Sequence, residues 1–343
     1  EIMQNKKAAY KFGFIMLLII ALIAALYLGA YDFNDSVFNI IQNYLQTKEH
    51  TTDSYVLIEL RIPRILMAIF TGAGLAICGT SLQGLFKNPL ASPDLIGITS
   101  GAVLFAAVTI VLGAHVIDWL PAFFRYTLLS IMSFVGALLT MIFVYRMATS
   151  KGKTHILILL LSGVAITALA GAVTGFLTYI STEEELRNLT FWSLGSLAGA
   201  NWWKVAIVVL FVTVGSFFLL SKDKTLNALM LGEKEAAHLG FNIEKTKKHI
   251  IIVVALIVGS MVAFNGTIGF IGLVIPYILR FLFQSNYKIL LPLSMLLGSL
   301  VLLIADTISR TVVAPAELPI GILTAMMGAP VFISILINYK RKL

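Results

Sequence analysis

The sequence predicts an all-α, polytopic membrane protein with about ten transmembrane helices. Hydrophobic residues make up 59% of the 343 and charged residues only 12%, and the core of a soluble domain could not hide so much apolar surface. Apolar runs of about twenty residues, the length that crosses roughly 30 Å of hydrocarbon, recur along the whole chain. We therefore expect a single membrane domain over residues 1–343.

The expected spans are, by residue number, 13–30, 64–84, 95–113, 127–146, 156–179, 204–220, 249–265, 268–284, 289–311 and 320–338. The sizeable hydrophilic stretches between them are 31–60, 181–203 and 221–248. The first run resembles a signal peptide, but no small-residue cleavage site follows Ala30, and its basic flank suits a retained helix.

Charge is distributed asymmetrically across these spans. With the N-terminus inside, most of the 25 lysines and arginines fall in inner loops or at the two ends of the chain. Most acids, including Asp32, Asp53 and the run 183–185, fall outside. This pattern is typical of a multi-pass protein of the bacterial cell membrane with both termini in the cytoplasm. The net charge of +8 therefore indicates membrane lipid as the neighbour, and not nucleic acid.

The chain lacks the residue patterns of an enzyme or a metal centre. The lone Cys78 excludes an internal disulfide and a thiolate cluster, and the histidines show no metal-ligand spacing. Gly152-Lys153-Thr154 resembles the end of a phosphate-binding loop, but Met147 stands where that loop needs glycine. We expect no metal and no cofactor bound by this chain. Any energy from ATP must come through a partner.

The cytoplasmic stretch 221–248 is the candidate dock for that partner. An apolar segment, 226–231, is broken by Gly232, and a second short helix ends at Gly240. This order predicts two short helices on the membrane surface that display Leu229, Met230 and Leu239. A plain solvated loop is the alternative, although it has little reason to expose apolar side chains in helical order.

Three arginines lie at the outer ends of spans. Arg61 and Arg64 flank Pro63, and Arg310 follows Asp306 by one helical turn, so an i,i+4 pair is expected there. Interfacial arginines commonly snorkel to the membrane surface. The alternative is a receptor for carboxylates on an extracellular protein, because arginine binds carboxylates in a bidentate manner.

The fifth span and the segment after it are the candidate wall of a transport path. The span is uncharged and combines small with hydroxylated side chains, and Phe191 and Trp192 follow next to a Gly/Ser-rich turn. A large solute needs weak, distributed contacts along its path. The alternative is ordinary helix packing through small residues. The predicted path residues are Ser162, Gly163, Thr167, Gly171, Thr174, Phe191 and Trp192.

Seven motifs occur in colinear order from Arg61 to the end of the chain, and together they resemble the FecCD/BtuC-type permeases. They are Arg61-x-Pro63-Arg64, the run 79–83, Asn88-Pro-Leu-Ala91 with Pro93 and Gly97, Leu231-Gly-Glu233 with Leu239-Gly240, Gly269-Phe-Ile-Gly272-Leu-Val-Ile-Pro276, Ala305-Asp306 with Arg310, and Glu317-Leu-Pro-Ile-Gly321 with Gly328-Ala-Pro330. These permeases belong to ABC importers of iron chelates, haem and cobalamin.

The resemblance implies a ten-helix subunit that pairs with itself or with a paralogue. Two cytoplasmic ATPase subunits, which hold ATP and Mg²⁺, and an extracellular substrate-binding lipoprotein would complete the complex. It implies that Arg61, Arg64 and Arg310 meet glutamates of the binding protein. It places the inner gate at Thr154 and His155, and the ATPase contact at Gly232, Glu233, Lys234, Glu235, Ala236, Leu239 and Gly240.

For the substrate, the resemblance favours an iron chelate, either haem or a ferric siderophore, with cobalamin as the alternative. An ion-coupled secondary transporter is the competing class, and it needs buried ionisable residues along its path. Asp306 alone approaches that description, and it has Arg310 beside it.

Overall fold

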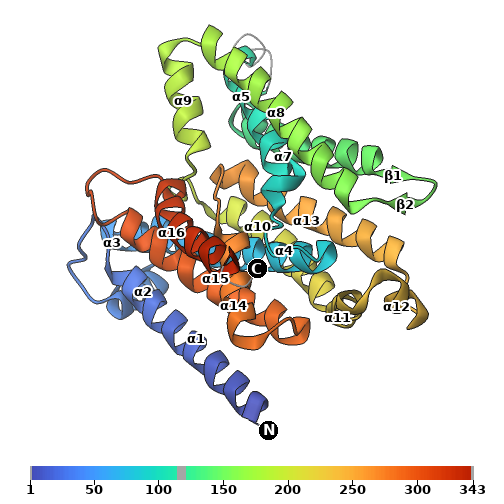
Figure 1. Cartoon of the computed structure of the whole chain (residues 1–343). Helices are drawn as coiled ribbons and strands as arrows, with labels where there is room; N and C mark the ends of the chain where they lie inside the picture. The colour runs from blue at the N-terminus through green and yellow to red at the C-terminus, as the bar shows by residue number, and fades with distance from the viewer. Residues whose placement is uncertain (1, 114–120, 341–343) are drawn as a thin grey trace.

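The computed structural model describes residues 2–113 and 121–340, so the ends of the predicted domain, residues 1 and 341–343, lie outside it. The long helices (Figure 1) are α1 (Ile2–Tyr27), α4 (Ile62–Phe86), α5 (Ile98–Leu112), α7 (Ala122–Ala148), α8 (Ile156–Ile180), α10 (Trp202–Leu220), α13 (Ile243–Asn265), α14 (Ile271–Phe283), α15 (Tyr287–Ser309) and α16 (Ile320–Lys340). The connections carry α2 (Val37–Thr47), α3 (Thr52–Tyr55), α9 (Glu183–Ser193), α11 (Asp223–Leu231), α12 (Glu233–His238) and the hairpin of β1 (Thr149–Ser150) and β2 (Lys153–Thr154).

The prediction of an all-α membrane protein with about ten spans is confirmed. Within the described residues, seven helices are long and apolar enough to cross a membrane, and three shorter apolar helices, Ile98–Leu112, Ile271–Phe283 and Ile320–Ser334, match the remaining predicted spans. The shortness of α14 has a local cause. The chain turns sharply at 266–270, where Gly266 and Phe270 both have positive φ, and the helix begins only at Ile271.

Helix α4 forms the centre of the molecule. In its most apolar window 83% of the residues are buried, compared with 72% for α15, 67% for α13 and only 6% for α1. Glycines allow this close packing, because a side chain at Gly79 would collide with the backbone of Gly272 on α14, and one at Gly72 would collide with Gly298 on α15. Helices α14 and α15 therefore approach α4 backbone to backbone at these glycines.

The start of α4 differs from the prediction. We expected a span that begins at residue 64 after a hydrophilic stretch, but helix is continuous from Thr52 to Phe86. Residues Val56–Arg61 form a π-helical segment directly before Ile62 and Pro63. Proline is tolerated near the start of an α-helical segment because its missing N–H is not needed there. The motif thus marks a change of helix type and does not begin the helix.

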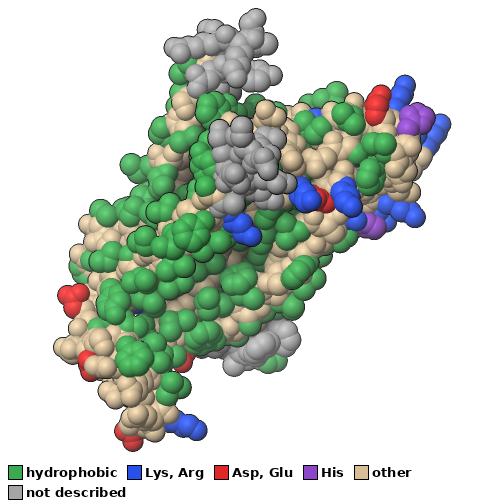
Figure 2. Space-filling model, turned by 90° about the horizontal axis from the view of Figure 1, so that it is seen from below, with side chains coloured by type: hydrophobic (Ala, Val, Ile, Leu, Met, Phe, Trp, Pro, Cys, Tyr) green, Lys and Arg blue, Asp and Glu red, His purple; other side chains and the backbone are tan. Residues whose placement is uncertain are grey.

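The charged side chains gather at opposite ends of the molecule (Figure 2). Lysines collect at the end that carries the hairpin and α12, and acids collect at the other end, with a broad apolar belt between them. We refer to these as the predicted cytoplasmic side and the predicted outer side.

Candidate functional site

A cavity of about 430 Å³ lies between α5, α8 and the turn after α13. Its walls are mostly apolar or hydroxylated, and they are formed by Asp94, Thr99, Ser100, Val103, Thr167, Ala170, Gly171, Thr174, Thr267, Ile268 and Gly269. Thr167, Gly171 and Thr174 are predicted path residues, so this part of the fifth span does face open space.

Sequence reasoning missed the polar residues that other elements bring to this cavity, and Asp94 is the charged one among them. It lies in the 3₁₀ helix Pro93–Ile96, which Gly97 ends with a φ of +82°. Its carboxylate accepts a hydrogen bond from the Thr99 hydroxyl at 2.6 Å. Ser100 and Thr167 join α5 to α8 through their hydroxyls at 3.1 Å. A signal was present in the sequence, because Asp94 is the only charge in the proline-rich loop 88–98.

The other predicted path residues lie elsewhere. Ser162 and Gly163 are buried, and a side chain at Gly163 would collide with the backbone of Leu95 and Ile96. Gly163 therefore provides packing against the loop and does not form a wall of the cavity. Phe191 is exposed near the end of α9, whereas Trp192 packs partly buried against the main core.

Helix α8 leaves a broad apolar surface uncovered in the single chain. Only 22% of its span is buried. The exposed side chains run along its full length and include Leu157, Leu161, Leu169, Phe176 and Tyr179. At its edge this surface reaches the cavity residues Thr167 and Gly171, which are also exposed.

Arg61 is held by the end of the first helix. It is 4% exposed and donates to the carbonyl oxygens of Leu26, at 2.7 Å, and Tyr31, at 2.6 Å. Its guanidinium also lies 4.3 Å from the centre of the Phe33 ring. These contacts satisfy carbonyl groups that the C-terminal end of α1 leaves without helical partners.

Arg64 lies between two carboxylates. It forms an ion pair with the buried Asp306 at 2.9 Å and another with Glu317 at 2.7 Å. The Glu317 side chain is 38% exposed. The Asp306 carboxylate is thus paired with the guanidinium of Arg64 on α4, while the Arg310 guanidinium donates to the Ala25 carbonyl at 2.5 Å. The i,i+4 pair expected between Asp306 and Arg310 is replaced by this pairing across helices.

The predicted coupling segment does contain two short helices, α11 and α12, joined at Gly232 (Figure 1). Gly232 has a φ of +143°, which side-chain-bearing residues rarely adopt. Met230, Leu231 and Leu239 are exposed, but the expectation for Leu229 is wrong, because it is 1% exposed and packs in the core. Ala236 is also buried and supports α12 from within.

Lys234 and Glu235 are exposed on α12 beside Glu233, and Gly240 ends the segment with a φ of +89°. The predicted gate residues lie in the neighbouring hairpin and its exit. His155 is exposed immediately before α8, whereas Thr154 is buried and its backbone N–H donates to Glu244 of α13 at 2.8 Å.

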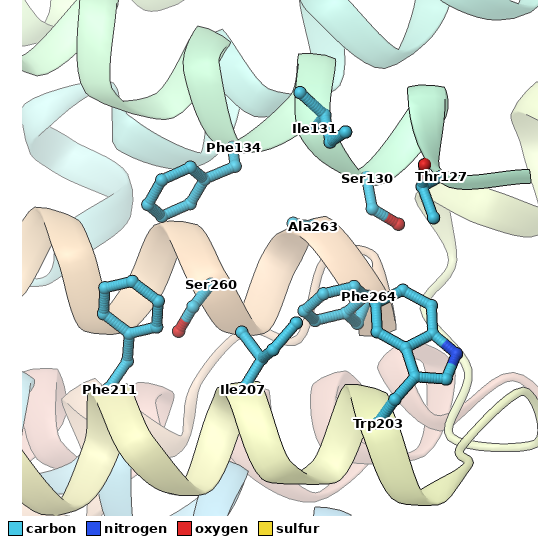
Figure 3. A pocket seen from close by; sticks show the side chains of 10 residues that line it. All are labelled: Thr127, Ser130, Ile131, Phe134, Trp203, Ile207, Phe211, Ser260, Ala263 and Phe264. Atoms are coloured by element: carbon cyan, nitrogen blue, oxygen red, sulfur yellow. The ribbon is translucent and has the colours of Figure 1, made fainter. Parts of the chain in front are cut away.

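A second cavity, of about 270 Å³, lies between α7, α10 and α13 (Figure 3). Its walls include the aromatic rings of Phe134, Trp203, Phe211 and Phe264, and they are almost entirely apolar. None of the predicted path residues lines it. This space suits hydrocarbon groups, which distinguishes it from the hydroxyl-lined cavity beside α8.

The sequence model that describes the FecCD transport family matches residues 17–338 of this chain. The chain belongs to this family. Among its relatives, the hemin transport system permease HmuU of Yersinia pestis is 36% identical over 331 residues, which cover 96% of each chain. The cobalamin import permease BtuC of Halobacterium salinarum is 39% identical over 81% of this chain and 72% of that protein.

A solved structure supports the same assignment. It is titled as an inward-facing conformation of a metal-chelate type ABC transporter, and it matches with a TM-score of 0.82 and 33% identity over 95% of this chain and 98% of the other. The chain is accordingly a permease subunit of an ABC importer in the cell membrane. It is not itself an enzyme, because ATP hydrolysis belongs to a separate subunit in this family.

Proposed function

We propose that this FecCD family permease takes up an iron chelate, either haem or a ferric siderophore, delivered by an extracellular binding protein. The observation that carries the proposal is the cavity beside α8, which is large, weakly polar and open toward an uncovered helix face. A bulky chelate needs many weak contacts, since tight ligation at one point would prevent release. The chelator satisfies the metal, so the path itself needs no iron ligand.

The likeness to HmuU over almost the whole of both chains supports an iron compound as the first candidate, although a molybdate permease, MolB of Haemophilus influenzae, is 35% identical over 96% of each chain. Cobalamin is the second candidate, because the sequence identity of this chain to BtuC is about as high as its identity to HmuU. Both classes are large and partly apolar, and both would fit walls made of methyl and hydroxyl groups.

The path in this proposal runs between two permease copies, identical or paralogous. In this arrangement the second copy would cover the apolar surface of α8, of whose span only 22% is buried in the single chain. Pairing through this surface would bring the two cavities together at the axis of the dimer. Phe191 would then lie near the outer mouth, and the hairpin with Thr154 and His155 near the inner one.

Two further contacts belong to the proposal. The exposed surface of α11 and α12 would contact the ATPase, which holds ATP and Mg²⁺, and both chain termini would lie on that cytoplasmic side. The binding protein would dock on the opposite side at the cluster of Arg61, Arg64 and Arg310. Arg61 and Arg64 are buried and already bonded, so a carboxylate that docks on them would have to displace an existing partner, and the 38% exposed Glu317 is the accessible one. The buried Arg310 bonds the Ala25 carbonyl, and its Nε has no hydrogen-bond partner among the described residues.

The deciding experiment measures uptake by the purified complex in proteoliposomes loaded with ATP. Haem, a ferric siderophore and cobalamin would be supplied separately with the binding protein, and accumulation would be counted with a labelled metal. We expect an iron chelate to accumulate and cobalamin to stay outside. Accumulation of cobalamin alone would replace the iron proposal, and loss of ATP-dependent transport with Gly232→Pro would test the coupling segment separately.

A further inference from the structure

A buried lysine joins three elements on the predicted cytoplasmic side. Lys247 lies in the second turn of α13, and its residue is only 2% exposed. Its amino group donates to Glu233 of α12 at 2.9 Å, to Glu244 of its own helix at 3.0 Å, and to the carbonyl of Thr154 in the hairpin at 3.2 Å.

These contacts use the full bonding capacity of the amino group. An ammonium group has three N–H donors and no acceptor, and each donor has an acceptor here. A buried ammonium group without partners would be costly, so Lys247 depends on these three acceptors. Thr154 is buried, whereas the Glu233 and Glu244 side chains are 44% and 34% exposed. The neighbouring Lys245 and Lys248 are exposed on the same helix.

The backbone of Thr154 is held from both sides. Its carbonyl accepts from Lys247, and its N–H donates to the Glu244 carboxylate at 2.8 Å. Thr154 is followed directly by His155 and the first turn of α8, where Leu159 bonds back to His155 at 2.9 Å. A displacement of Thr154 therefore acts on the start of the helix that carries Thr167, about 18 Å further along its axis.

We propose that Lys247 is the positioning residue that transmits movement of α12 to the hairpin and to α8. This inference rests on the proposed function, in which α12 contacts the ATPase. Glu233 is the exposed end of the link, with a side chain 44% exposed, and Thr154 is its buried end. When α12 moves, the ion pair of Glu233 with Lys247 moves the hairpin with it. The amino group of Lys247 bonds both Glu233 and the Thr154 carbonyl directly, so the two elements cannot move apart without breaking one of these bonds.

A purely structural lysine is the competing explanation. It predicts that removing the amine lowers stability and ATP hydrolysis together with transport. The proposed link predicts a different result, in which hydrolysis continues but the hairpin and α8 no longer respond to nucleotide.

The test uses the complete complex with its ATPase subunits in lipid nanodiscs, with two readouts. Spin labels at Ser150→Cys in the hairpin and Lys288→Cys at the start of α15 report the hairpin position by pulsed EPR. A cysteine at Thr167→Cys reports the path by its modification rate with a water-soluble maleimide. Each readout compares the nucleotide-free state with the state trapped by ATP and vanadate.

In the parent protein we expect the label distance to shift with nucleotide and the Thr167→Cys rate to change at least fivefold. Lys247→Met should keep at least half of the ATPase rate and lose more than half of the shift in label distance. The modification rates of Thr167→Cys in the two nucleotide states should then differ by less than twofold. Lys248→Met is the matched control and should behave as the parent. Lys247→Arg should restore most of the response.

Glu233→Gln is the second variant, because it removes the exposed end of the link while Lys247 keeps Glu244 as its partner. It should reduce the distance shift, and the double variant with Lys247→Met should be no worse than Lys247→Met alone, as expected for residues that act through one bond network. A full shift in either single variant, an equal loss in Lys248→Met, or a parent hairpin that ignores nucleotide would overturn the link. An unreactive Thr167→Cys in every parent state would refute the proposed path, while the label distance would still decide the link.

Discussion

The carboxylate of Asp306 on α15 accepts hydrogen bonds from the Nε of Arg64 on α4 at 3.0 and 3.1 Å. The two residues are 242 positions apart in the sequence, and Asp306 is fully buried. The pair therefore joins the central helix to its most extensive neighbour at the predicted outer end of the membrane.

Removing Arg64 should destabilise the protein strongly. Arg64→Met leaves the Asp306 carboxylate buried without its partner, and breaking such a pair costs about 3–5 kcal/mol. We expect a clear fall in the melting temperature of the detergent-solubilised protein. Glu317→Gln is the control, because it removes a half-exposed partner worth about 1 kcal/mol or less. Equal melting temperatures for Arg64→Met and the parent would contradict the role given to the pair.

Glu317 should compete with the binding protein for Arg64. Its side chain is accessible, while that of Arg64 is nearly covered, so Glu317→Gln should free the guanidinium for a carboxylate from outside. We expect the affinity for the binding protein to rise by about two- to fivefold, consistent with the modest strength of partly exposed pairs. Surface plasmon resonance at two salt concentrations would measure this change, and weaker binding would show that Glu317 itself belongs to the dock.

Two bulky substitutions on α8 should differ in their effect on folding, because only one of the two sites has room for a side chain. A side chain at Gly171 meets open space, whereas one at Gly163 collides with the loop backbone. Gly171→Trp should therefore block uptake in an assembled complex, and Gly163→Trp should reduce the yield of folded protein. Size-exclusion chromatography and proteoliposome uptake separate the two outcomes, and normal transport by Gly171→Trp would place the path elsewhere.

Asp94 should influence whether a negatively charged substrate passes the cavity as readily as a neutral one. Its carboxylate repels the propionates of haem but not a neutral ferric trihydroxamate. Asp94→Asn removes this repulsion, which at a separation of about 12 Å and an effective dielectric constant of about 20 is about 1.4 kcal/mol, or about tenfold. We expect haem uptake to rise by up to that factor and trihydroxamate uptake to change less than twofold. An unchanged rate for haem would mean that Asp94 does not face the moving substrate.

The spans were predictable because each requires about twenty apolar residues, and that requirement is visible without any tertiary contact. The helix that precedes α4, from Thr52 to Arg61, was not predictable, since Glu59 and Arg61 give it the polarity of a loop. Helix continues there because the end of α1 supplies carbonyl acceptors for Arg61, and those acceptors are known only from the fold.

The site was predicted in part for a similar reason. Gly163 and Thr174 are eleven residues apart, so a helix of 3.6 residues per turn places them on nearly the same face of α8. They differ only because the loop at Leu95 and Ile96 covers that face at Gly163, while at Thr174 it borders the cavity. Helical periodicity gives the direction of a side chain. How far along α8 the neighbouring loop covers that face depends on the whole fold.

The capping of α1 by distant arginines has a consequence for biogenesis. The carbonyl of Ala25 is bonded by Arg310, which is made 285 residues later. At bacterial elongation rates of 5–20 residues per second, that interval is roughly 15 to 60 s. During this time α1, which buries almost none of its own surface, lies in the bilayer with Arg61 as its partner but without Arg310 and α15. Nascent chains interrupted before α15 should accordingly retain a first helix anchored by Arg61 alone, which would make them better substrates for membrane proteases.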